Sequence, residues 1–412
     1  MRHLTLFAML CIPLHLAAAQ PYWNQFRGPN GDGVSEANDL PVRWTETENV
    51  AWKTPIHGLA WSSPVVWEDE IWMTTATEDG HKLSAVCIEL KSGKIIHDIL
   101  IFEVAEPQYR HPTNTHASST PIIEEGRIYL HYGSHGTACL DTTSQKKLWE
   151  RRDLPCNHWR GAGSSPIVHD DLLIVAYDGY DFQYVVALDK NTGETVWNKD
   201  RNIDYGTDNG DAMKAYSTAT VIEANGRQEL ISPSAMSTIA YNPATGDEFW
   251  RVNHGGMNAA IRPLFSNGLI YVCAGDGPEA LVAIKPGGNG DVTNSHVEWR
   301  TGKSTPKRPS QIVFKDLFFM IEDEGVASCL DANTGELIWK KRVGGKHWAS
   351  PIYANGRIYC FSKDGKAVVF AAQREFELLA ENEFEEGVWA APAVAGNALL
   401  VRSKNHLYCL KK

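Results

Sequence analysis

The chain has 412 residues, of which 39 are Lys or Arg and 50 are Asp or Glu, so its formal net charge is −11. We expect no nucleic-acid partner, because phosphate binding requires a basic face that so acidic a composition does not favour. Glycine, proline, asparagine and aspartate are frequent and no long helical period is present. These features are typical of all-β proteins, which reach this length as single units.

Residues 1–19 have the pattern of a signal peptide. A basic start at Arg2 is followed by an apolar run from Leu4 to Leu16 and by the small residues 17–19, all alanine. The apolar run is too short to span a bilayer, and no later segment is apolar enough to cross one. We therefore expect cleavage near Ala19 and an exported protein, periplasmic or secreted, without a membrane span.

A first recurring segment predicts the inner strands of a repeated unit. It contains small residues, usually a proline, then alternating apolar residues, a polar turn and a second apolar strand. Alternation with a period of two residues, bounded by turn residues, is typical of strands. Eight copies recur at intervals of about 40 to 57 residues. They begin at Ser62, Ser118, Ser164, Ser217, Ile261, Pro309, Ala349 and Ala390.

A second recurring segment has the form of a hairpin that ends in a large aromatic residue. CLDANTGELIW, from Cys329 to Trp339, is one clear copy, and in the copy that starts at Cys87 a histidine, His97, replaces the tryptophan. Asn and Gly suit the turn because they tolerate positive φ, which a tight hairpin requires. The tryptophans expected to dock between neighbouring units are Trp52, Trp149, Trp197, Trp250, Trp299 and Trp339.

The two ends of the chain are predicted to close a ring. Four strands per repeat of this length indicate a propeller blade. The last copy stops at Leu410 without its outer strand, and the segment 49–56 places Trp52 where other blades carry their tryptophan. We predict an all-β, eight-bladed β-propeller of four-stranded antiparallel blades, whose last blade is closed by the N-terminal strand. Residues 20–48 would form an N-terminal extension, and residues 49–412 a single propeller domain.

Most cysteines are predicted to be small core residues. Four of them align with Ala187, Ala240 and Ala283 of other blades, and a position that accepts either residue is a tight buried slot. These four are Cys87, Cys139, Cys329 and Cys409, while Cys273 and Cys360 match one another on the preceding strand. Cys156 lies in a loop before His158, and we expect this cysteine to be the exposed one.

The repeated hairpin resembles the tryptophan-docking motif of the pyrroloquinoline quinone (PQQ) propellers. That family includes PQQ-dependent alcohol and glucose dehydrogenases, and also the propeller subunit of the bacterial outer-membrane β-barrel assembly machinery, which binds no quinone. The segment FRGPNGDG, which starts at Phe26, extends the likeness to exported bacterial PQQ-like repeat proteins of unassigned function. The resemblance covers nearly all of the chain after the leader and implies the fold rather than the cofactor.

The resemblance also implies what a catalytic quinoprotein would need. The dehydrogenases of the family use a vicinal disulfide, a Ca²⁺ ion held by Glu, Asn and Asp, and a catalytic Asp. No two cysteines are adjacent in this sequence. We therefore expect no PQQ, with PQQ and Ca²⁺ as the less favoured alternative, and we identify no catalytic residue. No metal site is expected either, because the histidines match no short ligand spacing.

Ligands of propellers bind near the axis, where the first strand of each blade begins. Polar and aromatic side chains gather in the segments that lead into those strands, which suits an anionic or carbohydrate-like ligand, or the extended strand of a protein partner. Polar residues are also expected there for structural reasons, because strand starts line a wet channel. The candidates for binding at the channel mouth are Asn114, His116, His158, Arg160, Lys214, Tyr216, Asn258, Arg262, His347 and Trp389.

Three functions remain open at this point. The first is an exported non-catalytic propeller that binds a partner or ligand through its channel face, and we expect it to be a monomer. The second is a PQQ-dependent oxidoreductase. The third is a carbohydrate-active enzyme, a lyase or hydrolase that acts on an anionic sugar, which a deep pocket with a His or Tyr of shifted pKa beside Arg262 would favour.

Overall fold

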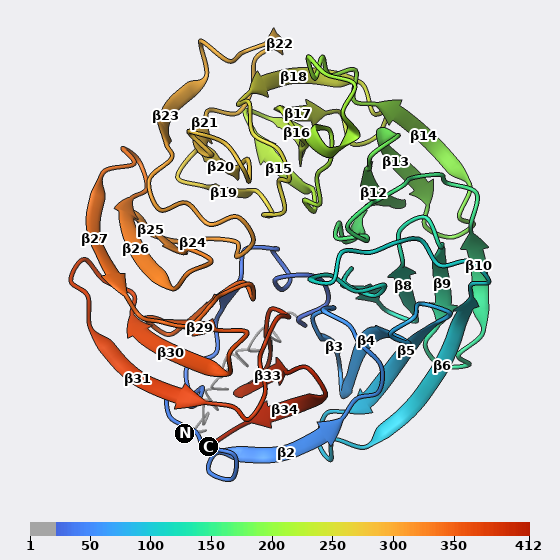
Figure 1. Ribbon diagram of the computed structural model, residues 1–412, viewed down its shortest axis with the longest axis vertical. Coiled ribbons are helices and arrows are strands. Elements are labelled where there is room, and N and C mark those ends of the chain that lie inside the picture. Colours follow the sequence, from blue (N-terminus) through green and yellow to red (C-terminus); the bar gives the residue numbers. More distant parts are fainter. Residues whose placement is uncertain (1–21) are drawn as a thin grey trace, which may run out of the picture.

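The computed structural model describes residues 22–412, so the predicted leader at residues 1–19 lies outside the described residues. Eight antiparallel sheets are arranged around a central axis (Figure 1). The prediction of an eight-bladed propeller is confirmed. The described helical structure is one short 3₁₀ turn, η1 (Gly210–Ala212). No helix in this part of the chain is long and apolar enough to cross a membrane.

The first four blades follow one another along the chain. The first has β3 (Val65–Trp67), β4 (Glu70–Ala76), β5 (Lys82–Glu89) and β6 (Ile95–Glu103). The second has β7 (Ile122–Glu124), β8 (Arg127–His131), β9 (Thr137–Asp141) and β10 (Lys147–Arg151). The third has β11 (Ile167–His169), β12 (Leu172–Asp178), β13 (Gln183–Asp189) and β14 (Thr195–Asp200). The fourth has β15 (Thr220–Ala224), β16 (Arg227–Pro233), β17 (Ser237–Tyr241) and β18 (Glu248–Asn253).

Extra strands join the edges of the fourth and seventh sheets. The fifth has β19 (Leu264–Ser266), β20 (Leu269–Cys273), β21 (Leu281–Ile284) and β23 (Val297–Thr301), and its β22 (Gly290–Asp291) joins the fourth sheet. The sixth has β24 (Ile312–Phe314), β25 (Leu317–Ile321), β26 (Val326–Asp331) and β27 (Leu337–Arg342). The seventh has β28 (Ile352–Ala354), β29 (Arg357–Phe361), β30 (Lys366–Ala371) and β31 (Leu378–Glu383), and β1 (Val34–Ser35) pairs with β28 in parallel.

The eighth blade closes the ring as the sequence predicted. It contains β32 (Ala393–Ala395), β33 (Ala398–Arg402) and β34 (His406–Leu410), and its outer strand is β2 (Val50–Pro55). Trp52 lies opposite Cys409 in this antiparallel pair. Trp149 and Cys139 form the same pair in the second blade. The position opposite each tryptophan has room only for Cys or Ala, because the indole ring lies directly across from it.

The outer tryptophans hold neighbouring blades together. The indole N–H of Trp197 donates to the Pro243 carbonyl oxygen of the next blade at 3.0 Å. Its ring covers Gly246, where an added Cβ would lie 2.7 Å from the indole. The hairpin glycine of one blade therefore leaves room for the tryptophan of the blade before it. Where that blade carries His97 instead, the next hairpin has Gln145 at positive φ in place of glycine.

A belt of hydroxyl groups links the inner strands around the axis. The backbone N–H of Ser63 donates to Thr120 Oγ1, that of Thr120 to Ser165 Oγ, and that of Ser165 to Thr218 Oγ1. In the same way, the backbone N–H of Arg262 donates to Ser310 Oγ, and that of Ser310 donates to Ser350 Oγ. Each bond joins one blade to the next. The recurring small residues before each inner strand therefore set the diameter of the ring.

Candidate functional site

One face of the propeller, here called the base, is closed by the N-terminal segment at residues 23–35. The carbonyl oxygens of Trp23 and Asn24 accept from inner-strand N–H groups of the first and second blades, at 2.8 and 2.9 Å. Gly33 accepts from the Tyr353 N–H of the seventh blade at 2.9 Å, and β1 continues this pairing. Figure 1 shows the segment in dark blue inside the ring of blades. The predicted extension is thus packed against the inner strands.

Two buried arginines fasten this segment. Arg262 donates from Nη1 to the Phe26 carbonyl oxygen at 2.6 Å and from Nη2 to Gln25 Oε1 at 3.1 Å. Arg27 donates to carbonyl oxygens of Gln311 and Pro351 on the sixth and seventh blades. Burial lowers the pKa of Arg27 to about 9 and that of Arg262 to about 10, although Asp32 opposes both shifts. Arg262, expected at the mouth, therefore holds the protein's own N-terminal segment at the base.

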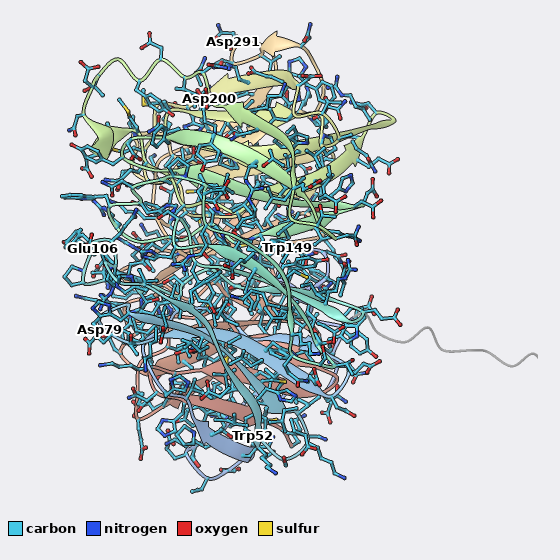
Figure 2. All side chains as sticks on the ribbon, turned by 90° about the vertical axis from the view of Figure 1, so that its right-hand side faces the viewer. Trp52, Asp79, Glu106, Trp149, Asp200 and Asp291 are labelled. Carbon is cyan, nitrogen blue, oxygen red and sulfur yellow. The ribbon has the colours of Figure 1, made fainter. Side chains whose placement is uncertain are left out.

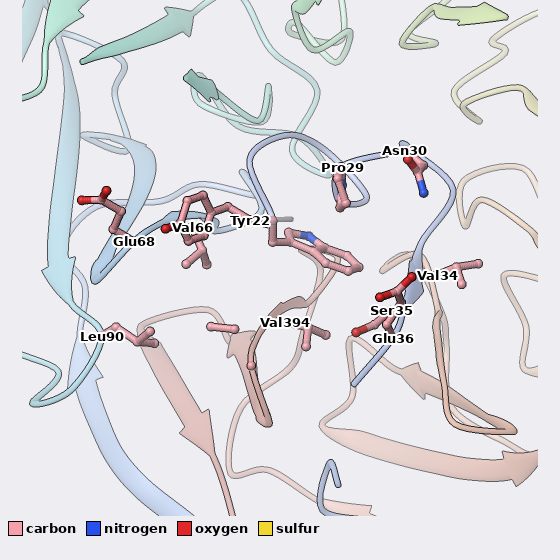
Figure 3. Close-up of a pocket in the computed structure, with 13 residues that line it drawn as sticks. Tyr22, Pro29, Asn30, Val34, Ser35, Glu36, Val66, Glu68, Leu90 and Val394 are labelled. Atoms are coloured by element: carbon pink, nitrogen blue, oxygen red, sulfur yellow. The ribbon is translucent and has the colours of Figure 1, made fainter. Parts of the chain in front are cut away.

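A cavity of about 330 Å³ also lies on the base side (Figure 3). Trp23, Val34 and Ser35 of the N-terminal segment line it together with Val66 and Val394 of the first and eighth blades. Its walls are mostly apolar, and the nearest acidic groups are Glu36 and Glu68 at the edge. The polar candidates of the sequence do not reach this cavity.

The opposite face, here called the mouth, contains a pocket of about 190 Å³ near the axis. Segments that lead into the inner strands of seven blades contribute to it. Asp79 and Glu106 mark this face at the left of the side view in Figure 2. The pocket is lined by Trp61, Thr113, Asn114, Arg160, Gly163, Tyr216, Asn258, Ala260, Asp276, Lys307, Arg308 and Trp348.

The lining of the mouth pocket is basic although the whole chain is acidic, because Arg160, Lys307 and Arg308 outnumber Asp276. Lys307 forms an ion pair with Asp276, and Arg308 with Asp323. No carboxylate of residues 22–412 forms a salt bridge with Arg160, and its buried Nε has no hydrogen-bond partner among them. Burial acts to raise the pKa of Asp276, but its contacts with Lys307 Nζ and Asn258 Nδ2 outweigh burial and lower the pKa. The pocket thus contains an uncompensated guanidinium.

Titratable neighbours respond to this charge. Burial, followed by the positive charges of Arg160 and Arg308, lowers the pKa of His111. Burial and then Arg160 lower the pKa of Lys214 to about 8. Both pKa values are lowered first by burial and only then by the neighbouring guanidinium groups.

Aromatic side chains surround the cationic groups. Trp61 stacks on Trp389 with ring centroids 4.5 Å apart and an interplanar angle of 11°. Arg308 and Lys363 each lie 4.4 Å from the ring centroid of Trp348. Such cation–π contacts fix the orientation of the Trp348 ring at the pocket wall.

The structure brings some of the predicted residues together and separates others. Asn114, Arg160, Tyr216 and Asn258 line the mouth pocket. His116 and Trp389 line a neighbouring hollow of about 670 Å³, which shares Trp61, Thr113 and Trp348 with the pocket. The remaining mouth candidates, which lie outside both hollows, are His158, Lys214, His347 and Arg262.

Three of these outlying residues are buried with structural partners. His347 is fully buried, and its two ring nitrogens contact the carbonyl oxygens of Phe361 at 3.0 Å and Gly344 at 2.9 Å. Lys214 Nζ forms an ion pair with Asp211. His158 Nδ1 lies 3.6 Å from Cys156 Sγ.

The cysteine predictions are confirmed except at one position. All seven cysteines of the described chain are free and buried, including Cys156, which is 2% exposed. The expectation that Cys156 is exposed was wrong. Its sulfur packs on Gly179, where an added Cβ would overlap it, so the loop is drawn onto the third blade.

Trp61 and Asp276 also line the pocket, although neither was predicted from the sequence. Trp61 precedes the first inner strand, as Trp389 precedes the eighth, and this shared position was the signal that could have found it. Asp276 follows β20, in a loop between the second and third strands of its blade. Those loops project to the same face as the strand starts, so they should have been searched too.

The donor groups at the mouth do not match a Ca²⁺–quinone site. Calcium takes six to eight oxygen ligands, usually with several carboxylates. Within residues 22–412 no group of three or more His, Cys, Asp or Glu side chains could hold a metal ion. The acid that lines the pocket, Asp276, is already bound by Lys307 and Asn258.

A family model described as outer membrane protein assembly factor BamB (PQQ_2) matches residues 103–235 and 293–379. These two segments make up more than half of the chain. The chain belongs to the PQQ_2 family. A curated relative, the outer membrane protein assembly factor BamB of Legionella pneumophila (strain Paris), is 21% identical over 245 residues. This alignment covers 59% of the chain and 49% of the relative, so the chain matches about half of the relative's length.

The chain superposes on solved propellers of two kinds, a BamB and a quinohemoprotein dehydrogenase. BamB from Moraxella catarrhalis superposes with a TM-score of 0.60 at 13% identity and covers 87% of this chain and 99% of its own. The quinohemoprotein alcohol dehydrogenase from Comamonas testosteroni gives a TM-score of 0.67 at 13% identity, with coverage of 96% and 81%. At such low identity these likenesses establish the propeller fold alone, so the function has to be argued from the mouth.

Proposed function

We propose that this chain is an exported, non-catalytic PQQ-like propeller that acts as a binding scaffold and contacts a protein partner through its mouth. Membership of a family named for an assembly factor supports a scaffold role. The base is closed by the protein's own segment, which leaves the mouth as the end of the channel open to a partner. The apolar run at residues 4–16 supports export.

An exposed row of aromatic rings carries this proposal. Tyr109, Trp159 and Tyr180 are 57%, 43% and 40% exposed. Tyr109 lines the hollow next to the mouth pocket, and Trp159 directly precedes Arg160 of that pocket. The Tyr109 and Trp159 ring centroids are 5.3 Å apart, and those of Trp159 and Tyr180 are 5.7 Å apart. Tyrosine and tryptophan in an exposed cluster are typical of the energetic centre of a protein interface.

The backbone at this row adds a second argument. Trp159 has φ +56°, a conformation that residues with large side chains rarely adopt. Strain of this kind is usually kept where it serves binding. In Trp159 it turns a large apolar ring outward instead of burying it.

The two enzymatic alternatives have less support. A PQQ-dependent oxidoreductase would need oxygen ligands for Ca²⁺, and the mouth offers mainly cations. A carbohydrate-active enzyme was linked to a His or Tyr beside Arg262, but that guanidinium is bound to Phe26 and Gln25. The residues of the mouth therefore favour the binding scaffold over either enzyme.

Site-specific photo-crosslinking in the native host tests the proposal. A photoreactive phenylalanine analogue is placed at Tyr109, Trp159 or Tyr180, and in matched variants at Leu148 or Leu337. The two leucines are 46% and 58% exposed on outer strands. We expect one defined protein adduct from all three mouth positions and none from the outer positions. The same adduct from Leu148 or Leu337, with none from the mouth, would place the partner on the rim and refute the proposal.

A further inference from the structure

Two polar atoms of the mouth pocket are buried and lack a partner. The Nε of Arg160 is a donor, and the Oδ1 of Asn258 is an acceptor, and neither has a hydrogen-bond partner within residues 22–412. The Asn258 amide orientation is fixed because its Nδ2 donates to Asp276 Oδ2 at 3.1 Å. A carboxylate accepts only, so the amide oxygen has to point away from it.

These two atoms describe the ligand that would satisfy them. Arg160 requires an acceptor and, because its charge is not compensated, favours an anionic one. A planar guanidinium matches a carboxylate with two parallel hydrogen bonds. Asn258 Oδ1 requires a donor, such as a hydroxyl group. A ligand that satisfies both side chains therefore carries an anionic acceptor such as a carboxylate and a donor such as a hydroxyl group.

The walls of the pocket select the body of the ligand. Trp61 and Trp348 line it from the first and seventh blades. Trp61 is held by its indole N–H, which donates to the Thr113 carbonyl oxygen at 3.2 Å, and by stacking on Trp389. A rigid indole face packs well against the C–H surface of a sugar ring, which is apolar on its faces and polar at its edge.

We propose that the mouth pocket binds a sugar acid, a hexuronate alone or at the end of an oligosaccharide. Arg160 binds the carboxylate, Asn258 Oδ1 accepts from a ring hydroxyl, and Trp61 packs against a ring face. The pocket of about 190 Å³ lies beside the larger hollow at His116 and Trp389, which gives further sugar units room along the mouth. This proposal concerns a small-molecule site and does not depend on the proposal of a protein partner.

Calorimetric titration of the purified protein tests this site. Galacturonate and trigalacturonate are compared with galactose and trigalactose, which lack the carboxylate but keep the hydroxyls. We expect trigalacturonate to bind at least about tenfold more tightly than trigalactose, because a hydrogen bond to a charged group contributes about 1.5–3 kcal/mol, and a tenfold change in affinity corresponds to about 1.4 kcal/mol.

Variants assign the preference to named residues. Arg160→Gln is expected to remove the discrimination between trigalacturonate and trigalactose, while Trp61→Ala weakens both. Arg342→Gln is the matched control, because Arg342 is an exposed arginine on outer strand β27. It should leave both affinities unchanged.

Three results would overturn the proposal. Equal binding of acid and neutral sugars would show that Arg160 does not select a carboxylate. Binding of acetate as tight as that of galacturonate would leave no role for the sugar ring. Binding of a short poly-glutamate peptide that depends on Arg160, without binding of any sugar acid, would identify the pocket as part of a protein interface. A failed crosslinking experiment would leave the sugar-acid titration unaffected, so the two ideas fail separately.

Discussion

The closure of the base predicts a large effect for Gly31→Ala. Gly31 has φ +70°, and an added Cβ would overlap the Arg262 guanidinium carbon. Left-handed backbone costs a non-glycine residue about 1–2 kcal/mol. Displacing Arg262 removes charge-assisted bonds to Phe26 and Gln25, worth about 1.5–3 kcal/mol for such a group. We therefore expect the free energy of unfolding to fall by about 2.5–5 kcal/mol in total.

Gly226→Ala separates the two causes. Gly226 also lies on the base side, in the β15–β16 turn, with φ +74°, but an added Cβ would meet nothing within 4 Å. This variant should therefore lose only the backbone contribution of about 1–2 kcal/mol. Urea unfolding followed by tryptophan fluorescence measures both, and proteolysis reports whether residues 23–35 become accessible. Equal destabilisation of the two variants, with an unchanged cleavage pattern, would refute the role given to Arg262.

Three further outcomes follow from the blades and the mouth. Trp197→Phe should destabilise the fold by about 1–3 kcal/mol, because it leaves the buried Pro243 carbonyl without its donor. Trp159→Phe, on the exposed row, should change the stability in urea by less than about 0.5 kcal/mol. Equal losses in the two variants would show that tryptophan docking does not hold neighbouring blades together. Burial lowers the pKa of His158 and of His254 to about 4. Both histidines are neutral in the folded protein, whereas in the unfolded chain they take up protons below a pKa of about 6.5. Their contribution to stability is therefore full above pH 6.5 and is lost as the pH falls toward 4, by about 1.4 kcal/mol per pH unit for each histidine. A flat stability between pH 7 and 4.5 would contradict this, and His254→Gln should reduce the slope. PQQ with Ca²⁺ should give no saturable quenching of tryptophan fluorescence, whereas quenching at a stoichiometric ratio would revive the oxidoreductase.

Much of the fold could be predicted because it is encoded locally and repeated. Each hairpin shows its own turn and its own tryptophan, so the register of Trp52 against Cys409 follows from the copy at Trp339 and Cys329. The repeat also identified the tight slot for cysteine. Contacts between the docking tryptophans and the hairpin glycines were not predicted, because each joins two copies that the alignment treats as equivalent.

The mouth could be predicted as a region but not residue by residue. Strand starts of a propeller share one face, so Asn114 and Arg160 were expected near each other. Whether a side chain reaches the pocket depends on its local partners, and Lys214 turns instead toward Asp211. Arg262 was misplaced for a different reason. Its partner Phe26 lies 236 residues away, in a segment without repeat pattern.

Two buried arginines add contacts between blades beside the positions where the hydroxyl belt is interrupted. In the fifth blade Arg262 occupies the hydroxyl position, and its side chain binds the N-terminal segment instead. In the eighth blade Ala391 occupies that position, and buried Arg402 donates to the carbonyl oxygens of Ser62 and Thr74 of the first blade at 3.0 and 2.9 Å. Arg262 Nε also donates to Thr220 Oγ1 of the fourth blade at 3.0 Å, so each of these arginines joins its own blade to a neighbouring one. Arg160 has no such task in the described chain, and its unpaired guanidinium is left for a ligand.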